Sequence, residues 1–191
     1  MEILCFCGWI ATSEISIRAQ EIEAPEPQVK AAFVYNLAKL VEWPTNTFPS
    51  PTAPLRIGVV GRDPVFRPLE TTLRGKTIDG HPVQLVRASA NNLANATNCH
   101  ILFFGESERR TLSQVLAQID SLPILTVSDM KGFRSVGMIE LVKTNEHINL
   151  GINPVAAERA GLKLSSRLLR LDRSLHPPEE ATPDFPKPPE Q

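Results

Sequence analysis

The chain has 191 residues, of which 42% are apolar, and a formal net charge of −1. This length suits one domain, and the apolar fraction is sufficient for a hydrophobic core, unlike that of a disordered chain. Because the charge is near zero, no overall field favours nucleic acid, and nucleic-acid binding is not expected. No window approaches the roughly 18–20 apolar residues of a membrane-spanning helix, so we expect the mature protein to be soluble.

The N-terminus has features of a secretory signal. An apolar run, Ile3–Ala11, precedes the more polar stretch Thr12–Gln20, and small residues at Ala11 and Ser13 could frame a cleavage site. No Lys or Arg precedes the run, so a first strand or helix of the domain, or a misplaced start codon, remains an alternative. We expect residues 1–24 to direct export, residues 25–174 to form the domain, and the Pro- and Glu-rich residues 175–191 to be a disordered tail.

The three cysteines do not predict a disulfide or a metal site. Cys5 and Cys7 would leave with the export segment, so Cys99 alone would remain and no intramolecular disulfide could form. Cys5-x-Cys7 also has no second ligand pair at zinc spacing. We expect Cys99 to be a small buried strand residue.

A helix is predicted from Pro25 and Pro27 through Val41. Its apolar residues recur at spacings of three and four and are assigned to the core: Val29, Phe33, Leu37, Leu40 and Val41. Trp43-Pro44 should end the helix, because a residue before proline disfavours the helical region.

The rest of the chain alternates between strands and helices. Expected strands are 55–60, an extended stretch 77–86 with a turn at Asp79-Gly80, 99–104, 123–127, and a hairpin of 138–143 and 147–152. Expected helices are 65–73 capped by Asp63, 106–119, 153–160 capped by Asn153, and 163–172. This order predicts an α/β protein, a three-layer α/β/α sandwich with apolar central strands and a C-terminal β-hairpin.

No catalytic motif accompanies this pattern. Gly58–Gly61 follows a strand but lacks the G-x-G-x-x-G spacing of a dinucleotide site, and there is no phosphate-binding loop or nucleophile elbow. A phospho-receiver would need an acidic pair beside its phosphorylated Asp, whereas Asp63 is better placed as a helix cap and Asp129 stands alone. The four histidines are isolated in the sequence. We therefore expect a binding protein without enzymatic activity, cofactor or metal.

The wording of several segments resembles the YfiR family. Val29–Pro44 reads VKAAFVYNLAKLVEWP, and the similarity continues in order over most of the chain. It includes LRIGVVGRD (55–63), LRGKTIDGHPVQLVR (73–87), CHILFFGES (99–107), ILTVSDMKGF (124–133), GMIELV (137–142) and INLGINPVAAERAGLKLSSRLLRL (148–171).

The resemblance implies a periplasmic α/β/α regulator, often dimeric, without enzymatic activity. It further implies binding to the periplasmic region of a membrane-bound diguanylate cyclase, repression of that cyclase, lower cyclic di-GMP and less biofilm. A relative is linked to redox control through cysteine pairs, but the LRIGVVG segment here carries no cysteine, so disulfide sensing is not expected.

Two surfaces are candidates for contact with such a partner. On the first helix, Tyr35, Asn36 and Lys39 fall off the apolar stripe, while Trp43 at its end could either plug the core or contact a partner. Near the C-terminus, arginines recur every three residues beside an apolar face of leucines, and the two assigned to a partner surface are Arg167 and Arg170. A solvated basic edge is the alternative for the arginines.

Two other functions remain open. A small-ligand-binding module would use the loops after the strands, at Gly61–Pro64, Gly105–Glu106 and Ser128–Phe133, because ligands of open α/β sheets bind beyond the carboxyl ends of strands. An unrecognised hydrolase is the third possibility.

Overall fold

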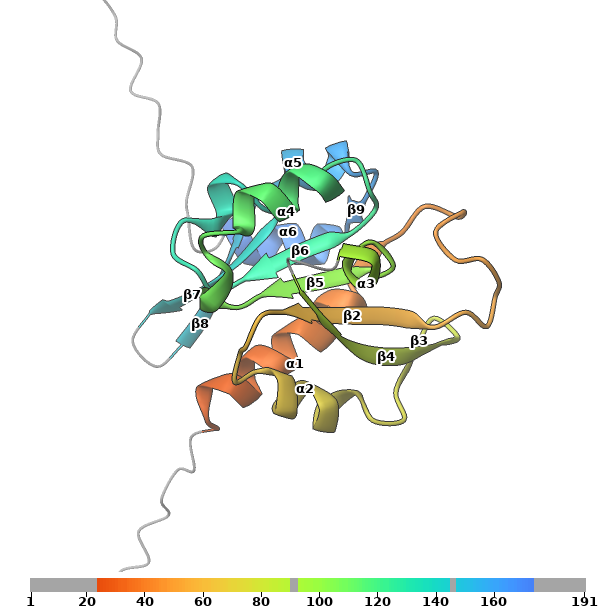
Figure 1. Ribbon diagram of the computed structural model, residues 1–191, viewed down its shortest axis with the longest axis horizontal. Helices are drawn as coiled ribbons and strands as arrows, with labels where there is room; N and C mark the ends of the chain where they lie inside the picture. Colours follow the sequence, from red (N-terminus) through yellow and green to blue (C-terminus); the bar gives the residue numbers. More distant parts are fainter. Residues whose placement is uncertain (1–23, 90–92, 145–146, 174–191) are drawn as a thin grey trace, which may run out of the picture.

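A seven-stranded sheet forms the centre of the molecule (Figure 1). The computed structural model describes residues 24–89, 93–144 and 147–173. The strand order is β3-β4-β2-β5-β6-β7-β8, and β1 pairs separately with β9. The strands are β1 (Val41–Glu42), β2 (Leu55–Val60), β3 (Thr77–Ile78), β4 (His81–Ala88), β5 (Ile101–Phe104), β6 (Leu125–Ser128), β7 (Ile139–Thr144), β8 (His147–Ile152) and β9 (Lys163–Leu164). Strands β4, β2, β5, β6 and β7 are parallel, while β3 and β8 close the two edges by antiparallel pairing.

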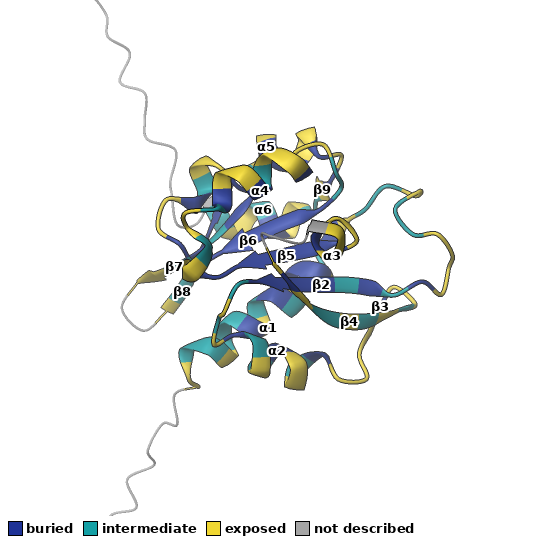
Figure 2. Cartoon of the chain, in the orientation of Figure 1, coloured by how far each residue is buried: buried dark blue, intermediate teal, exposed yellow. Residues whose placement is uncertain are grey.

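Helices cover both faces of this sheet and make the three layers that the sequence predicts. The helices are α1 (Glu26–Ala38), α2 (Phe66–Leu73), α3 (Leu93–Thr97), α4 (Leu112–Ile119), α5 (Pro154–Arg159) and α6 (Ser166–Arg173), with single turns η1 (Glu106–Glu108) and η2 (Phe133–Ser135). Alternate residues of the central strands enter different cores: Ile101 and Phe103 pack with α1, α2, α5 and α6, whereas Leu102 and Phe104 pack with α3 and α4. The α/β/α prediction is confirmed, and the central strands are buried on both sides (Figure 2).

The first helix is shorter than the sequence predicts and buries another face. It ends at Ala38 rather than Val41, and Val41–Glu42 is strand β1. Its buried residues are Ala31, Val34, Leu37 and Ala38. Val29 and Phe33, which were assigned to the core, are only half-buried. Two of the four buried residues are alanines. The predicted stripe was based on the larger apolar residues and left these alanines out, so it was centred on the wrong face of the helix.

Other boundaries also differ from those expected. The predicted helix 106–119 is the turn η1 followed by α4, and the predicted helix 163–172 begins with β9 before α6. The sequence analysis missed β1, β9 and α3. Because β1 and β9 are two-residue strands that exist only through their mutual pairing, no local pattern predicts them.

Of the two turns predicted between strands, the first is described by the structure and the second is not. Asp79 and Gly80 connect β3 to β4 with φ of 51° and 86°, the left-handed geometry of a type I′ hairpin turn. The predicted C-terminal hairpin is confirmed as β7–β8, in which Ile139 lies opposite Ile152 and Thr144 opposite His147. Residues 145–146 of its turn, residues 1–23 of the predicted export segment 1–24, residue 174 at the end of the predicted domain and the predicted tail 175–191 lie outside the described residues.

Within the described ranges, no helix combines the length and apolar composition needed to cross a bilayer. No group of three or more His, Cys, Asp or Glu in that part of the chain could hold a metal ion.

Candidate partner-binding site

The pairing of β1 with β9 brings the two predicted partner surfaces together. Val41 lies opposite Leu164, and the Ser165 backbone N–H donates to the Leu40 carbonyl at 3.0 Å. The end of α1 therefore adjoins the start of α6. Leu37 and Leu168, one from each helix, are both fully buried in the same core. Residues separated by more than 120 positions in the chain consequently share one surface.

A groove of about 440 Å³ lies between these helices. We call it the α1–α6 groove, and it is lined by Phe33, Asn36, Leu37, Lys39, Leu40, Leu150, Arg167, Leu168 and Leu171. Its apolar lining includes Leu171, which is 44% exposed. The lining contains Lys39 and Arg167 and no acidic residue, so the groove is apolar with basic groups beside it.

Three of the six candidate partner residues line this groove, namely Asn36, Lys39 and Arg167. Tyr35 adjoins it: the Lys39 ammonium lies over the Tyr35 ring, 4.4 Å from the ring centroid, which is a cation–π contact across one helical turn. Arg170 is exposed on α6 but does not line the groove.

Trp43 has a different environment. The ring is half-buried against the main core and makes an edge contact with His100, with 6.2 Å between ring centroids. Its buried Nε1 has no hydrogen-bond partner in the described structure. Trp43 therefore packs against the core, the first of the two roles considered from the sequence, and its contact with a partner stays a prediction.

The sequence analysis missed the apolar lining from Leu150, Leu40 and Phe33. Leu40 and Phe33 were assigned to the core stripe, and Leu150 belongs to the hairpin strand β8. Leu171 had a sequence signal, because it follows Leu164 and Leu168 on the apolar face of the C-terminal segment. No signal in the sequence indicated that this face would adjoin α1.

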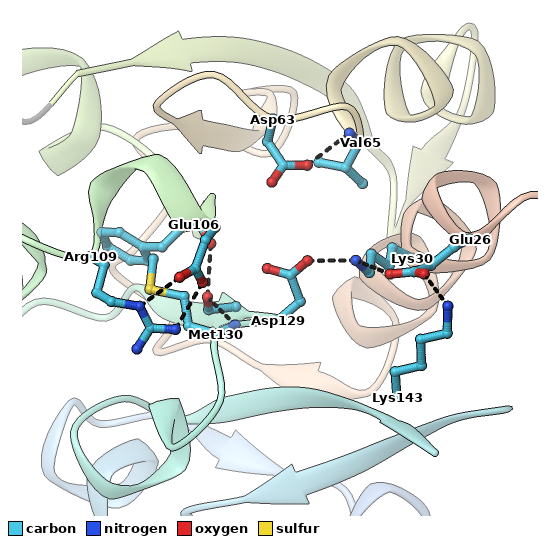
Figure 3. Close-up of polar contacts among 11 residues, drawn as sticks. Glu26, Lys30, Asp63, Val65, Glu106, Arg109, Asp129, Met130 and Lys143 are labelled. Carbon is cyan, nitrogen blue, oxygen red and sulfur yellow. Dashed lines mark hydrogen bonds and ion pairs between the residues drawn. The ribbon is translucent and has the colours of Figure 1, made fainter. Parts of the chain in front are cut away.

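A chain of charged groups fixes the other end of α1 (Figure 3). The Lys30 ammonium pairs with Asp129, at the end of β6, and with Glu26, one turn earlier in α1. Lys143 of β7 pairs with Glu26 in turn. Hydrogen bonds from Lys143 and Lys30 lower the pKa of Glu26 to about 2. Burial opposes the charge of Lys30, but its bonds to Asp129 and Glu26 outweigh that effect and raise its pKa.

The loops at the carboxyl ends of β2, β5 and β6 meet beside this network. Asp63 accepts from the Val65 backbone N–H at 2.8 Å, so it holds the turn before α2 rather than capping the helix as predicted. Burial raises the pKa of Asp63. A Cβ on Gly105 would lie 2.9 Å from the Asp63 carboxylate, so these loops are tightly packed against one another. The network also includes Lys30, Glu26 and Lys143, which lie in α1 and β7 outside these loops. The sequence could not predict them, because they are distant from the loops along the chain.

Comparison of the sequence with models of known protein families identifies the family of this chain. A sequence model of the YfiR/HmsC-like family matches residues 27–173, which includes the whole described domain except its first three residues. The chain belongs to the YfiR/HmsC-like family. No individual curated protein matches it significantly. The family resemblance seen in the sequence is thereby confirmed.

In this YfiR/HmsC-like domain, Cys99 and His100 lie just before the amino-terminal end of β5. Burial raises the pKa of the Cys99 thiol to about 11, so the thiol stays protonated at neutral pH and is a poor nucleophile. The Arg56 backbone N–H donates to His100 Nδ1 at 3.0 Å, and burial lowers the pKa of His100 to about 4. Both side chains are buried, which confirms the predicted burial of Cys99. The prediction that Cys99 is a strand residue is wrong, because β5 begins at Ile101 and Cys99 lies just before it. Their environment favours structural roles.

Proposed function

We propose that this protein is a periplasmic regulator that binds and represses a membrane-bound diguanylate cyclase and so lowers cyclic di-GMP. The observation that carries the proposal is the family match over residues 27–173, because YfiR/HmsC-like proteins are regulators of diguanylate cyclase signalling. The apolar run Ile3–Ala11 supports export to the periplasm. Lower cyclic di-GMP would in turn reduce biofilm formation. Regulation by binding requires no catalytic group from this chain.

We further propose that the α1–α6 groove contacts the cyclase. Its apolar lining is exposed at Leu171 and partly exposed at Phe33 and Leu40. Apolar groups that solvent can reach, with polar groups at their edge, are typical of protein-interaction sites. Asn36, Lys39 and Arg167 would make direct polar contacts, and Tyr35 and Arg170 would extend the surface on each helix. The half-buried Trp43 would support this surface from the loop after β1. The regulator would assemble as a homodimer, as the family resemblance implies.

The binding proposal is tested with the purified periplasmic regions of diguanylate cyclases encoded near this gene. We expect one of them to retain the protein in a pull-down, and deletion of the gene to raise cellular cyclic di-GMP. Absence of both effects would refute the proposed function.

The site proposal is tested by reversing charges at the groove in a chain that ends at Arg173, the last residue of the family match. Lys39→Glu with Arg167→Glu should weaken cyclase binding by roughly 10-fold or more, because rim charges set complementarity and association rate. The matched control is Arg74→Glu with Lys76→Glu, which makes the same charge change at exposed residues after α2 that do not line the groove. Equal binding by the two double variants would exclude the groove as the contact.

A small-ligand-binding role is the second candidate. A cleft of about 390 Å³ near the amino-terminal ends of β2 and β5 is lined in part by Thr47, Arg56 and Asn98. The Thr47 hydroxyl is buried without a hydrogen-bond partner in the described structure, and a polar ligand could satisfy it. This cleft differs from the carboxyl-end loops suggested by the sequence. A thermal-shift screen in which no polar metabolite stabilises the protein would count against this role.

A further inference from the structure

The α1–α6 groove has basic groups but no acidic counterpart. Lys39 and Arg167 form no ion pair with any residue that the structure describes, and none of the nine lining residues is acidic. Both side chains are exposed. Leu171 is the exposed apolar residue of the lining, Phe33 and Leu40 are half-buried, and the other leucines are buried beneath them. A segment that fills the groove should therefore carry an apolar group to cover these three residues and negative charge for the edge.

The C-terminal segment of this same chain has that composition. Residues 174–191 read SLHPPEEATPDFPKPPEQ and contain four acidic residues, Glu179, Glu180, Asp184 and Glu190, against one lysine, Lys187. Phe185 is the aromatic residue of the segment and directly follows Asp184. The family match ends at residue 173, so this segment lies outside the matched domain.

The place where the segment begins favours contact with the groove. Leu171 lines the groove and α6 ends at Arg173, so the segment starts three residues after a lining residue. The helix α6 has eight residues and is about 12 Å long at 1.5 Å per residue. At about 3.1 Å per residue in an extended proline-rich conformation, the twelve residues from Ser174 to Phe185 can reach about 37 Å. The segment is therefore long enough to turn back along the groove.

We propose that residues 174–191 bind the α1–α6 groove of their own chain and compete with the partner for it. Phe185 would occupy the apolar lining, and the acidic residues before it would face Lys39 and Arg167. Attachment at Arg173 gives the segment an effective concentration of the order of millimolar, so even a weak contact would be populated. Prolines restrict the free segment and reduce the conformational entropy lost on binding. The competition rests on the proposed function, whereas the intramolecular contact does not.

The contact is tested on the protein without a partner. The whole gene is expressed, and the protein is purified after any removal of the predicted export segment in the cell. Amide NMR shifts of the wild type are compared with those of Phe185→Ala and of the tail control Thr182→Ala. We expect Phe185→Ala to shift the amides of groove residues such as Leu37, Leu150 and Leu168, and Thr182→Ala to leave them unchanged. Unchanged groove amides in Phe185→Ala would overturn the proposal. Shifts that disappear on dilution would also overturn it, because they would assign the groove to a second copy.

Charge exchange provides an independent check that the acidic residues face the groove. In the Lys39→Glu, Arg167→Glu chain, adding Phe185→Ala should cause little further shift of the groove amides, because the segment has already left the groove. When Glu179→Lys, Glu180→Lys and Asp184→Lys are also present, Phe185→Ala should again shift them. Absence of this recovery, while the exchanged chain remains folded by circular dichroism, would contradict the charge pairing.

The competition is tested by affinity for the cyclase. If the segment occupies the groove nine-tenths of the time, Phe185→Ala should bind the cyclase about 10-fold more tightly than the wild type. Equal affinities would refute the competition. Failure of both proteins to bind any cyclase would refute the proposed function alone, because the NMR result is obtained without the cyclase.

Discussion

Gly58 of β2 lies in direct contact with Cys99, which is in the chain between α3 and β5. A Cβ built on Gly58 would lie 2.7 Å from the Cys99 sulfur and 3.6 Å from the Cys99 Cβ. The second distance falls within the range of about 3.5–4.5 Å found in disulfides. The Cys99 thiol occupies the space that a side chain at position 58 would fill. Because Gly58 has no sulfur, no disulfide can form between these two positions in this chain.

We predict that Gly58→Cys will form a disulfide with Cys99 on oxidation. The bridge should stabilise the oxidised variant relative to its reduced form by about 3 kcal/mol, because it closes a long loop in the unfolded chain. Thiol titration and urea unfolding, each with and without reductant, measure both effects. Gly58→Ala is the matched control, since it crowds Leu102 in the same way but adds no sulfur. Retention of both free thiols under oxidising conditions would disprove the prediction.

His100 makes the stability of the protein depend on pH. Its pKa is lowered to about 4 in the folded protein, against about 6.5 for an exposed histidine. Between these values the unfolded chain binds more protons than the folded one, so the folded state loses stability as the pH falls. The neutral ring that accepts from the Arg56 backbone N–H is the form that the fold requires.

We predict a loss of about 2 to 3 kcal/mol in the free energy of unfolding from pH 7 to pH 4 through His100. Urea unfolding at several pH values measures this slope. His100→Asn offers a side-chain oxygen where Nδ1 accepts its bond, and it does not titrate in this range. The variant should lose stability at pH 7 but show a flatter pH dependence. An unchanged slope would assign the effect to other groups.

At the scale of elements, α1 is held at both ends by residues distant in the sequence. Its first turn is tied to β7 and to the end of β6 through Glu26 and Lys30, and the chain just after it is tied to β9 through Val41. The Lys30 and Asp129 side chains are only 13% and 19% exposed. Asp129 Oδ1 is buried without a hydrogen-bond partner among the described groups, so Lys30 is the main compensation for this carboxylate.

We predict that Lys30→Met will lower the free energy of unfolding by about 1 to 3 kcal/mol, because it leaves the Asp129 carboxylate largely buried without its ion partner. The loss should shrink as the pH falls, since Asp63, whose pKa is raised, then becomes neutral and no longer repels Asp129. Lys143→Met is the control: this lysine is 58% exposed, and exposed pairs contribute about 0–1 kcal/mol. Chemical denaturation of both variants provides the comparison. Equal losses would show that burial of the pair does not matter.

At the scale of the whole molecule, order should decrease from the centre of the sheet to its edges. Strands β2 and β5 are buried between two helical layers and paired on both sides. The edge strand β3 has two residues, and the end of the β7–β8 hairpin is exposed (Figure 2). Local opening requires less free energy where few buried contacts are lost.

We predict that backbone amides of Ile57, Val59, Ile101 and Phe103 will be the slowest to exchange with solvent. Those of Thr77, Lys143 and Thr144 should exchange much faster. Native-state hydrogen exchange measured residue by residue tests this order. Comparable protection at Thr144 and Phe103 would indicate a rigid hairpin and contradict the prediction.

Prediction from sequence succeeded best for features with a local cause. The apolar runs of β2, β5 and β6, the Asp79-Gly80 turn and the cap at Asn153, whose Oδ1 accepts from the Ala156 backbone N–H, follow from short-range chemistry. The buried face of α1 was partly mispredicted, because Ala31 and Ala38 become core residues only through the neighbours that surround them. For the candidate site, the sequence predicted Lys39 and Arg167 as partner residues on two separate surfaces, because both are polar residues beside an apolar stripe. It did not predict that they line the same groove.

The sequence by itself determined the α/β class, the central strands and the family, since hydrophobic pattern and residue wording are properties of the chain. Only the tertiary structure decided that α1 and α6 form one groove, that Leu150 contributes to it, and that Lys30 reaches Asp129. The physical reason is that these contacts join segments separated by about 100 residues or more, and they arise from strand pairing and packing around a shared core. Individual residue patterns specify which faces can be buried, whereas the assembled sheet determines which of those faces meet.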